Sequence, residues 1–290
     1  MEYSFFLGCT IPAREPSFEA SARLVFKKLG VNLVDLKGAL CCAPAPIESI
    51  DHNTSRAIAA YNIALAEESN LDLVTLCNGC FQALARTNRL LKEDVEVRAD
   101  VNEVLSSIGK KYKGTIEVVD FLQVLNSERV MEKIKKSVSK PLKDVKVAVF
   151  YGCHALKPSK FLMLDDPDQP RILDDLVEIT GAQSVPYEHK MKCCGGLLRG
   201  VSDDLARKLA QNKLFNVSQA KADCIVTICP FCHIQLDIGQ LEVNRRFNEQ
   251  YAIPVLHYPQ LLGLSMGINP LRLGLQTHKV STDSLLTKIK

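Results

Sequence analysis

Ten of the eleven cysteines in this chain follow a single pattern that occurs twice. Each copy has one cysteine, a gap of 31 or 39 residues, two adjacent cysteines, a gap of 34 residues and a Cys-x-x-Cys pair. The first set is Cys9, Cys41, Cys42, Cys77 and Cys80, and the second set is Cys153, Cys193, Cys194, Cys229 and Cys232. Because the 34-residue gap is identical in both copies, the pattern indicates an internal duplication.

The residues around the cysteines repeat as well. The matching segments are FFLGC at 5–9 with VFYGC at 149–153, VTLCNGC at 74–80 with VTICPFC at 226–232, and VDFLQVL at 119–125 with LHYPQLL at 256–262. A stretch rich in lysine at 131–143 separates the two copies. We therefore expect two domains, residues 1–140 and residues 141–290, the second of which ends in a polar tail.

Short apolar runs alternate with helical patterns in both copies. Strands are expected at 3–7, 31–36 and 71–76 in the first copy, and at 145–151, 183–188 and 224–228 in the second. Helices are expected at 17–30, 54–69 and from about Gly79, and at 166–181, at 202–220 with Ser202 as cap, and after Pro230. This alternation predicts an α/β fold of two tandem, duplicated parallel-sheet domains. The cysteines then follow strand ends, at the edge where open α/β sheets bind ligands.

Composition argues against several classes of function. The net charge is only +3, from 36 basic and 33 acidic residues, and no basic run is interleaved with aromatic residues, so nucleic-acid binding is not expected. No stretch approaches the roughly 18 apolar residues of a membrane-spanning helix. A signal peptide has a basic segment before its apolar region, and the short apolar run near the start of this chain has none. We expect a cytoplasmic protein without a direct membrane span.

The cysteines are poor candidates for disulfides. Reducing conditions in the cytoplasm keep thiols free. Adjacent Cα atoms are about 3.8 Å apart, whereas an unstrained disulfide needs roughly 4.4–6.8 Å. Metal binding or redox catalysis is therefore the leading interpretation. Cys224 stands outside the pattern at the start of a predicted strand and is expected to be a buried core thiol.

Five thiols per copy narrow the choice of metal site. Structural zinc and a cubane iron–sulfur cluster each take four ligands, a dithiol needs only the Cys-x-x-Cys pair, and the ferredoxin cysteine run is missing. Buried structural cysteines would not repeat in fives. The residues themselves favour two thiolate-rich iron–sulfur sites, one per copy, with a non-catalytic zinc-binding scaffold as the alternative from another class.

The pattern resembles the cysteine-rich, or CCG, domain family, in which a cysteine, a Cys-Cys-Gly motif and a Cys-x-x-Cys pair follow one another at similar gaps. A tandem pair of this length is similar to the B subunit of heterodisulfide reductase, a likeness that extends from Cys9 to the segment 257–262. Ala43 departs from the motif because it stands where the family has glycine, while Gly195 conforms. We expect this departure to affect local geometry rather than ligation.

The resemblance implies a catalytic subunit that reduces the mixed disulfide of coenzyme M and coenzyme B in methanogenesis. Each set of five cysteines would hold one non-cubane [4Fe-4S] cluster, and the disulfide would be cleaved between the two clusters. His154 and His233, each directly after a patterned cysteine, are candidate proton donors to the product thiolates. Lys192 and Arg199 flank the second pair and are candidate anchors for the substrate's sulfonate and phosphate groups.

Electrons would have to come from another protein, because the chain has no ferredoxin or flavin motif of its own. The resemblance implies a ferredoxin-like C subunit that is fed by a flavin-containing A subunit. Related cysteine-rich domains also occur in thiol-driven fumarate reductases, in succinate dehydrogenase-like complexes and in lactate or glycolate oxidising systems. These remain alternative functions within the same family.

Overall fold

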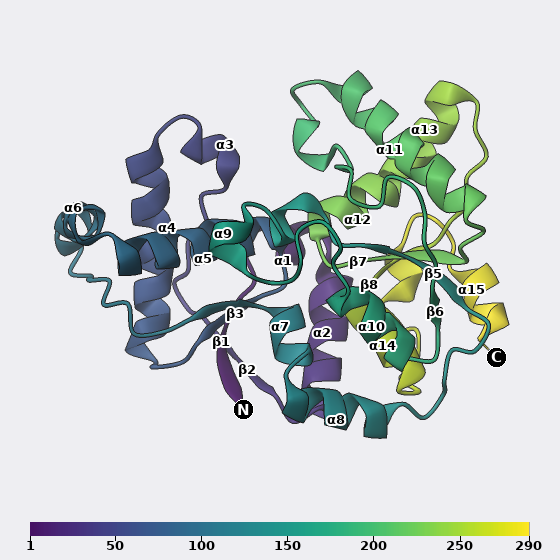
Figure 1. Cartoon of the computed structure of the whole chain (residues 1–290), viewed down its shortest axis with the longest axis horizontal. Coiled ribbons are helices and arrows are strands. Elements are labelled where there is room, and N and C mark those ends of the chain that lie inside the picture. The colour runs from purple at the N-terminus through teal and green to yellow at the C-terminus, as the bar shows by residue number, and fades with distance from the viewer. Residues whose placement is uncertain (290) are drawn as a thin grey trace.

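A computed structural model describes residues 1–289 and contains two four-stranded parallel sheets (Figure 1). The first sheet has the order β2-β1-β3-β4 and the second has the order β6-β5-β7-β8. The strands are β1 (Glu2–Phe6), β2 (Asn32–Asp35), β3 (Leu73–Thr75), β4 (Val118–Asp120), β5 (Lys146–Phe150), β6 (Gln183–Ser184), β7 (Cys224–Thr227) and β8 (Val255–His257). Each copy of the cysteine pattern therefore builds one sheet, and the predicted α/β fold class is confirmed.

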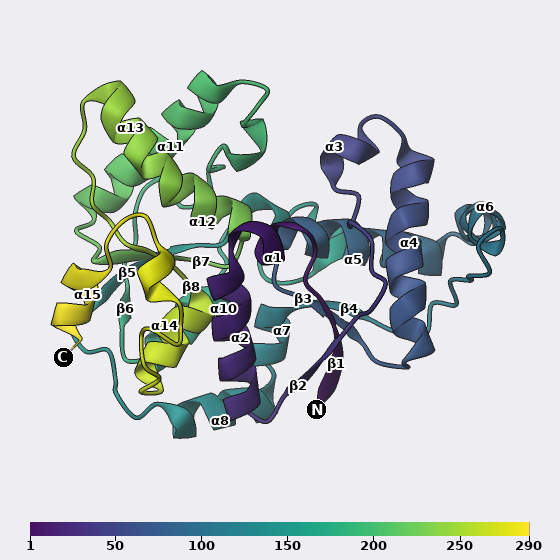
Figure 2. The same cartoon turned by 180° about the vertical axis from the view of Figure 1, so that it is seen from behind.

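Helices cover both faces of the first sheet. They are α1 (Thr10–Arg14), α2 (Pro16–Lys28), α3 (Ala45–Glu48), α4 (His52–Glu68), α5 (Asn78–Glu93), α6 (Val95–Ser106), α7 (Phe121–Leu125) and α8 (Glu128–Ser137). The connections between the parallel strands place α2 on one face and α4 and α5 on the other (Figures 1 and 2). Several begin with a clear cap: the carboxylate of Asp51 accepts hydrogen bonds from the N–H groups of Asn53 and Thr54 at the start of α4.

The second sheet is covered in the same way. Its helices are α9 (Ser159–Leu162), α10 (Ile172–Ile179), α11 (Asp203–Gln219), α12 (Pro230–Leu236), α13 (Ile238–Phe247), α14 (Tyr258–Ser265) and α15 (Asp283–Lys288), with short 3-10 turns η1 (Cys153–Ala155), η2 (Gly196–Leu198) and η3 (Leu275–Thr277). Figure 1 shows α11, α12 and α13 on one side of the sheet and α10 and α14 on the other. No helix in residues 1–289 combines the length and apolar character needed to cross a bilayer.

The sequence predictions miss the fourth strand of each sheet, and one predicted helix starts too early. Strands β4 and β8 have three residues each and lie at the start of the matched segments 119–125 and 256–262. The helix predicted over 166–181 begins only at Ile172. The carboxylate of Asp165 accepts hydrogen bonds from the backbone N–H groups of Arg171 and Ile172 (2.8 and 2.7 Å), and this satisfies in a loop the donors that a longer helix would use.

Two smaller predictions are corrected as well. The strand predicted over 183–188 pairs only at Gln183 and Ser184, because Pro186 has no N–H group to continue the ladder. Ser202 stands at the start of α11 but makes no capping hydrogen bond through its side chain. Cys224 is fully buried in β7, as predicted, and burial raises the pKa of its thiol.

The two sheets are joined through helices α2 and α14, which lie side by side (Figure 2). Phe18 of α2 packs edge-on against Phe121 and stacks on His257, whose ring centroid is 3.8 Å away. A single apolar cluster runs through this contact and includes core residues of both repeats, such as Val25 and Leu261. Because the interface is continuous with both cores, the repeats are held in a fixed relation rather than tethered by a linker.

A buried acidic group crosses the same interface. The Glu15 carboxylate, at the junction of α1 and α2, lies 3.1 Å from Nδ1 of His233 and 3.2 Å from Nε2 of His257, both from the second repeat. All three side chains are buried. Burial acts to raise the pKa of Glu15, but the hydrogen bonds from His233 and His257 outweigh it and lower that pKa to about 2. Glu15 is therefore ionised and links the two repeats.

We expect Glu15→Gln to destabilise the folded chain by about 3 kcal/mol, because it leaves the buried histidines without their anion. Urea unfolding at neutral pH measures this. Since the pKa of Glu15 is about 2 in the folded chain and about 4.3 when unfolded, its contribution is present above pH 4.3. The difference between wild type and variant should shrink as the pH falls from there toward 2.

Glu19→Gln is the matched control. Glu19 lies on the same helix and pairs with Arg23 in a partly exposed i,i+4 salt bridge of 2.8 Å. Its loss should cost only about 0.5 kcal/mol. Equal effects of the two substitutions would show that Glu15 does not hold the repeats together.

Candidate metal centre

The patterned cysteines gather where the carboxyl ends of the two sheets meet. Cys9 directly precedes α1 and follows β1, while Cys77 caps α5 after β3. In the second repeat, Cys153 follows β5 and Cys229 caps α12 after β7. The second cysteine of each Cys-x-x-Cys pair lies in the first turn of α5 or α12. Parallel strands carry all their carboxyl ends to one edge, which explains why residues so distant in sequence converge.

The two sets form one continuous group of sulfur atoms. Nine thiols interact in succession, in the order Cys41, Cys42, Cys80, Cys77, Cys229, Cys232, Cys194, Cys193 and Cys153. The Sγ atoms of Cys194 and Cys232 are 3.5 Å apart. The link between the repeats is the interaction of Cys77 with Cys229, which lowers the pKa of Cys77. The tenth thiol, Cys9, lies near Cys41 and affects its pKa.

Burial is distributed in the same way within each set. The second member of each adjacent pair and both members of each Cys-x-x-Cys motif are buried. The first member of each pair, Cys41 or Cys193, is exposed, and the leading cysteine, Cys9 or Cys153, is exposed or half-buried. Each adjacent pair therefore directs one thiol into the protein and the other toward the surface.

A left-handed residue follows each adjacent pair. Ala43 has a φ of +51° and Gly195 has a φ of +84°. In both repeats this residue donates its backbone N–H to the first sulfur of the pair, and the Gly195 nitrogen lies 3.3 Å from Sγ of Cys193. Ala43 therefore keeps the turn of the glycine that the motif has at this place, although the left-handed region costs a residue with a Cβ roughly 1–2 kcal/mol.

A glycine before each leading cysteine gives the thiols their room. Gly8 and Gly152 have φ values of +68° and +76°. A Cβ on Gly8 would lie 2.8 Å from Sγ of Cys80, and a Cβ on Gly152 would lie 3.1 Å from Sγ of Cys232. It would also lie 2.8 Å from Nδ2 of Asn78, which donates a 2.6 Å hydrogen bond to the Tyr151 carbonyl across the junction. Both repeats therefore need a glycine before the leading cysteine, because its φ is positive and a Cβ would crowd a sulfur atom.

Shared protons ionise some of the thiols. A hydrogen bond from Cys41 lowers the pKa of Cys42 to about 4, and a hydrogen bond from Cys153 lowers the pKa of Cys193 to about 2. The electrostatic field of His154 also lowers the pKa of both Cys42 and Cys193. The donors Cys41 and Cys153 have raised pKa values for the same reason. Thiolates, the form that binds metals, are therefore present at neutral pH.

A cavity of about 250 Å³ opens onto the five cysteines of the second set. It is lined by Pro44, Asn78, Gly79, Cys153, His154, Cys193, Cys194, Gly196, Leu197, Leu198, Leu209, Cys229, Phe231 and Cys232. Residues of both repeats contribute to its wall, and most of the lining that is not sulfur is apolar. A wider groove on the surface, the outer groove, is also lined by Cys153 and His154. Lys157 and Lys160 lie along this outer groove.

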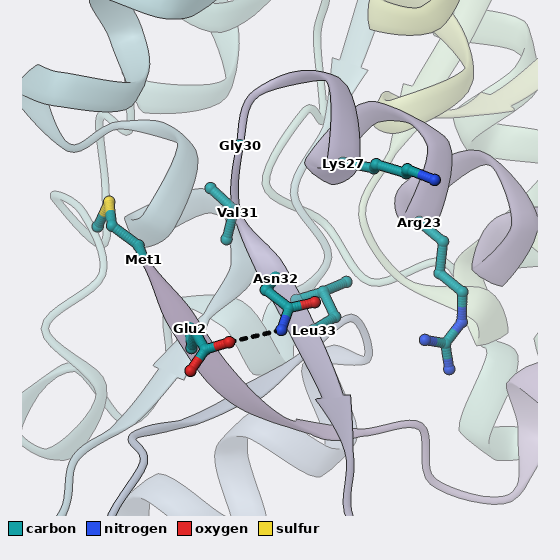
Figure 3. Close-up of a pocket in the computed structure, with 8 residues that line it drawn as sticks. All are labelled: Met1, Glu2, Arg23, Lys27, Gly30, Val31, Asn32 and Leu33. Atoms are coloured by element: carbon teal, nitrogen blue, oxygen red, sulfur yellow. Dashed lines mark hydrogen bonds between the residues drawn. The ribbon is translucent and has the colours of Figure 1, made fainter.

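Figure 3 shows a different hollow, of about 600 Å³, beside β1 and β2. Its lining residues are Met1, Glu2, Arg23, Lys27, Gly30, Val31, Asn32 and Leu33. It lies at the amino-terminal ends of these strands, opposite the edge that carries the cysteines. A hydrogen bond of 2.6 Å from Asn32 to Glu2 crosses it, and no patterned cysteine lines it. The chemistry therefore belongs to the smaller cavity.

The structure separates the predicted proton donors. His154 lines the cavity, with its Nδ1 next to Gly79 of the opposite repeat. His233 points away from it, because its Nε2 lies 3.0 Å from the Val255 carbonyl and its Nδ1 faces Glu15. The geometry thus gives His233 a place in the interface and offers it no route to the cavity.

The predicted anion anchors are separated too. Arg199 turns toward α12 and α13, where it donates to Gln235 (2.7 Å) and pairs with Glu242 (2.6 Å), so its charge is already compensated. Lys192 is exposed beside Cys193. The groove residues Lys157 and Lys160 were not predicted. Their only sequence signal is a position a few residues after Cys153, which does not distinguish them from surface lysines.

Ten convergent thiols are a suitable donor set for iron–sulfur clusters. Soft thiolates favour iron–sulfur clusters and zinc over hard cations, and five thiols per repeat exceed the four that a zinc site takes. Gly8 and Gly152 lie so close to the sulfur atoms of Cys80 and Cys232 that a Cβ at either position would crowd them. The fold and the site thus define a tandem α/β protein with two facing thiolate sets.

Comparison with known proteins agrees with this class. The model of the CCG cysteine-rich domain matches residues 3–85 and 147–237. The B subunit of a ferredoxin:CoB-CoM heterodisulfide reductase from Methanosarcina mazei is 44% identical over 99% of this chain and 96% of its own length. The chain belongs to the tandem CCG cysteine-rich family that includes the B subunit of heterodisulfide reductase.

One further relative and one solved structure are similar to this chain. The membrane anchor subunit of an 8-methylmenaquinol:fumarate reductase from Wolinella succinogenes is 34% identical over 98% of this chain and 99% of its own length. A solved structure of a hypothetical protein from Helicobacter pylori superposes with a TM-score of 0.77 and 17% identity, over 97% of this chain and 52% of that one. The latter likeness shows the fold alone.

We expect Gly152→Ala to destabilise the chain by about 3 kcal/mol and to lower the iron content of the second thiol set. The added Cβ is strained by the positive φ and meets Asn78 and Cys232. Gly109→Ala is the control, since its φ is +67° and nothing lies within 4 Å of the added Cβ. Unfolding curves and iron analysis measure both variants. Equal losses would mean that the close approach to the thiols is unimportant.

Proposed function

We propose that this chain is a catalytic subunit that reduces a small-molecule disulfide to two thiols between its two thiolate sets. The proposal rests above all on the junction of the two thiol sets, where Asn78, next to Cys77, donates a 2.6 Å hydrogen bond to the Tyr151 carbonyl and Cys77 interacts with Cys229. Sites far apart could not each take one sulfur of a single S–S bond. The names of the relatives that share nearly the full length of the chain support this reading.

In the proposed arrangement each set of five cysteines holds one non-cubane [4Fe-4S] cluster. The two clusters would supply one electron each, which together meet the two-electron demand of S–S cleavage. The reaction consumes two electrons and two protons and releases two thiols. Because the patterned thiols are assigned to metal, they are not free for the usual thiolate attack on a disulfide.

The chain's own residues would bind and orient the substrate. Leu197, Leu198 and Phe231 form apolar walls of the cavity, which suit the alkyl groups on either side of a disulfide and exclude water from the sulfur atoms. His154 is the titratable side chain placed to deliver a proton there, since it lies between the cavity and the outer groove. A proton could thus pass from solvent to a nascent thiolate.

The substrate proposed is the mixed disulfide of coenzyme M and coenzyme B, as the names of the relatives indicate. Its anionic groups need basic partners at the mouth of the cavity. Lys160 in the outer groove, together with Lys192, fits that role better than Lys157, which lies 3.9 Å from Asp168, or Arg199, which is paired with Glu242.

Electrons would come from partner subunits, because the relatives are subunits of reductase complexes. A ferredoxin-like C subunit that receives electrons from a flavin-containing A subunit remains the proposed route. The full-length likeness to a component of a fumarate reductase supports a second candidate, in which the chain relays electrons without cleaving a disulfide.

An anaerobic preparation tests the proposal. We expect about four irons and four sulfides per repeat with visible absorption, and a spectral change when 2-mercaptoethanesulfonate is added to the oxidised protein. Cys77→Ser should lower the iron content, whereas Cys224→Ala, outside the pattern, should not. Zinc without iron would favour the scaffold. Iron–sulfur clusters whose spectrum does not change when the thiol is added would favour electron relay.

His154→Gln should slow disulfide cleavage about 100-fold while iron content and absorption stay unchanged, because the substitution removes a proton donor and leaves all ten thiols in place. Steady-state reduction with an artificial one-electron donor measures the rate. His52→Gln is the control, since His52 is exposed on α4. An unchanged rate for the His154 variant would assign proton delivery to another group.

A further inference from the structure

A buried lysine on α11, Lys213, lies beside the second thiol set and has no role in the function proposed above. Its side chain is 1% exposed. Its ammonium donates hydrogen bonds to the carbonyls of His189 (2.6 Å) and Lys190 (3.0 Å), which are neutral groups. The nearby carboxylate of Asp174 pairs with Lys190 instead, at 2.7 Å. Within residues 1–289, Lys213 therefore has no carboxylate in salt-bridge contact.

The surroundings of Lys213 are otherwise apolar. Its ammonium lies 4.1 Å from the ring centroid of Phe150 and 5.7 Å from that of Tyr187. Phe150 is the last residue of β5 and belongs to the same core cluster as Cys194, Cys229 and Cys232. The lysine thus sits in the low-polarity medium that surrounds the second thiol set, where charges act on one another strongly.

A buried cation needs an anion, because carbonyl dipoles and aromatic faces compensate only part of the cost of removing it from water. In the second set, the hydrogen bond from Cys153 lowers the pKa of Cys193 to about 2, and the other patterned thiols become anionic when they bind a metal as thiolates. Burial lowers the pKa of Lys213 to about 8, and the fields of Cys194 and Cys232 act in the opposite direction to keep it protonated. The thiolate set is therefore the counter-charge of this lysine.

The first repeat has a different residue at this place. Helices α4 and α11 both have 17 residues, and their buried positions match when Ala59 is aligned with Ala210, which places Asn62 at the position of Lys213. Asn62 is an uncharged, buried side chain whose Nδ2 donates a 3.1 Å hydrogen bond to the Cys41 carbonyl. Two sites with matched thiols therefore differ by one buried positive charge.

We propose that Lys213 raises the reduction potential of the cluster in the second thiol set above that of the cluster in the first. The proposal rests on the proposed function, because it requires clusters in both sets. An added electron makes a cluster more negative, and a fixed cation in the same apolar medium stabilises that reduced form. The second site then accepts an electron before the first, so the duplicated sites take unequal roles.

Lys213 also positions the second set through its two carbonyl contacts. His189 and Lys190 begin the loop that leads to Cys193, and His189 itself has a positive φ of +61°. A test must therefore separate charge from position. Lys213→Gln removes the charge but keeps an N–H donor for these carbonyls, and Lys213→Arg keeps the charge. Lys208→Met, an exposed lysine on the same helix, is the matched control.

The experiment is an anaerobic potentiometric titration followed by electron paramagnetic resonance. Each lysine variant is made in a Cys41→Ser/Cys42→Ser background, which retains the second site, and in a Cys193→Ser/Cys194→Ser background, which retains the first. Charges about 10 Å apart at an effective dielectric of about 20 change such an equilibrium about tenfold. We expect Lys213→Gln to lower the potential of the second site by a shift of this size, about 59 mV for one electron. The first site should move less, and Lys213→Arg and Lys208→Met should match wild type.

Several outcomes would overturn the inference. An unchanged potential in Lys213→Gln with iron retained would show that the charge is not felt by the cluster. A shift or loss of iron in Lys213→Arg as large as in Lys213→Gln would make the role of Lys213 purely positional. Wild-type protein without iron or a paramagnetic signal would instead refute the proposed function on which the inference rests.

Discussion

The meeting of two sheet edges at the contact between Cys77 and Cys229 is the constraint on which the rest of the site depends. Both residues occupy the N-cap position of a helix that follows a central strand, so their interaction brings two helix N-termini near one another. Anionic sulfur suits such a place, because the helix dipoles and free N–H groups favour negative charge. Asn78 reinforces the contact with its hydrogen bond to the Tyr151 carbonyl. If the edges were apart, each repeat would hold its thiols alone.

The interface behind the thiols keeps these edges together. Helices α2 and α14 supply apolar packing, and Glu15 supplies a buried charge that His233 and His257 share. His233 follows Cys232 directly, so the interface anchor and the second Cys-x-x-Cys motif lie on the same helix, α12. This explains why a histidine beside a patterned cysteine is structural in one case, whereas its counterpart after Cys153 faces the cavity.

Duplication gives the site its symmetry, and a few substitutions break it. The GC turns and the thiol burial repeat in both halves. The residue after the adjacent pair differs in type but has the same left-handed conformation, Ala43 against Gly195. Lys213 of α11 and its counterpart in α4, Asn62, differ in charge. Backbone geometry is thus shared between the halves while their electrostatics diverge, as expected if one fold serves two unequal electron sites.

Much of this could be predicted from the sequence, and the failures have local causes. Three strands per repeat and their main helices are predictable, because apolar runs and helical periodicity are local signals. Strands β4 and β8 are not predicted, because a strand of three residues is too short to show a recognisable alternation of apolar and polar residues. The helix over 166–181 is predicted too long, because hydrogen bonds from the backbone to Asp165 compete with helical ones. Neither Lys157 nor Lys213 carries a sequence signal that sets it apart from other lysines.

By itself the sequence determined the duplication, the two sets of five thiols, the α/β class and the membership of the CCG family, because spacing and periodicity survive without coordinates. Only the tertiary structure decided that the two sets touch, that His154 faces the cavity while His233 faces Glu15, and that Arg199 is already paired. The reason is physical. These properties depend on distances between residues far apart in the chain, and such distances are set by how the two repeats pack.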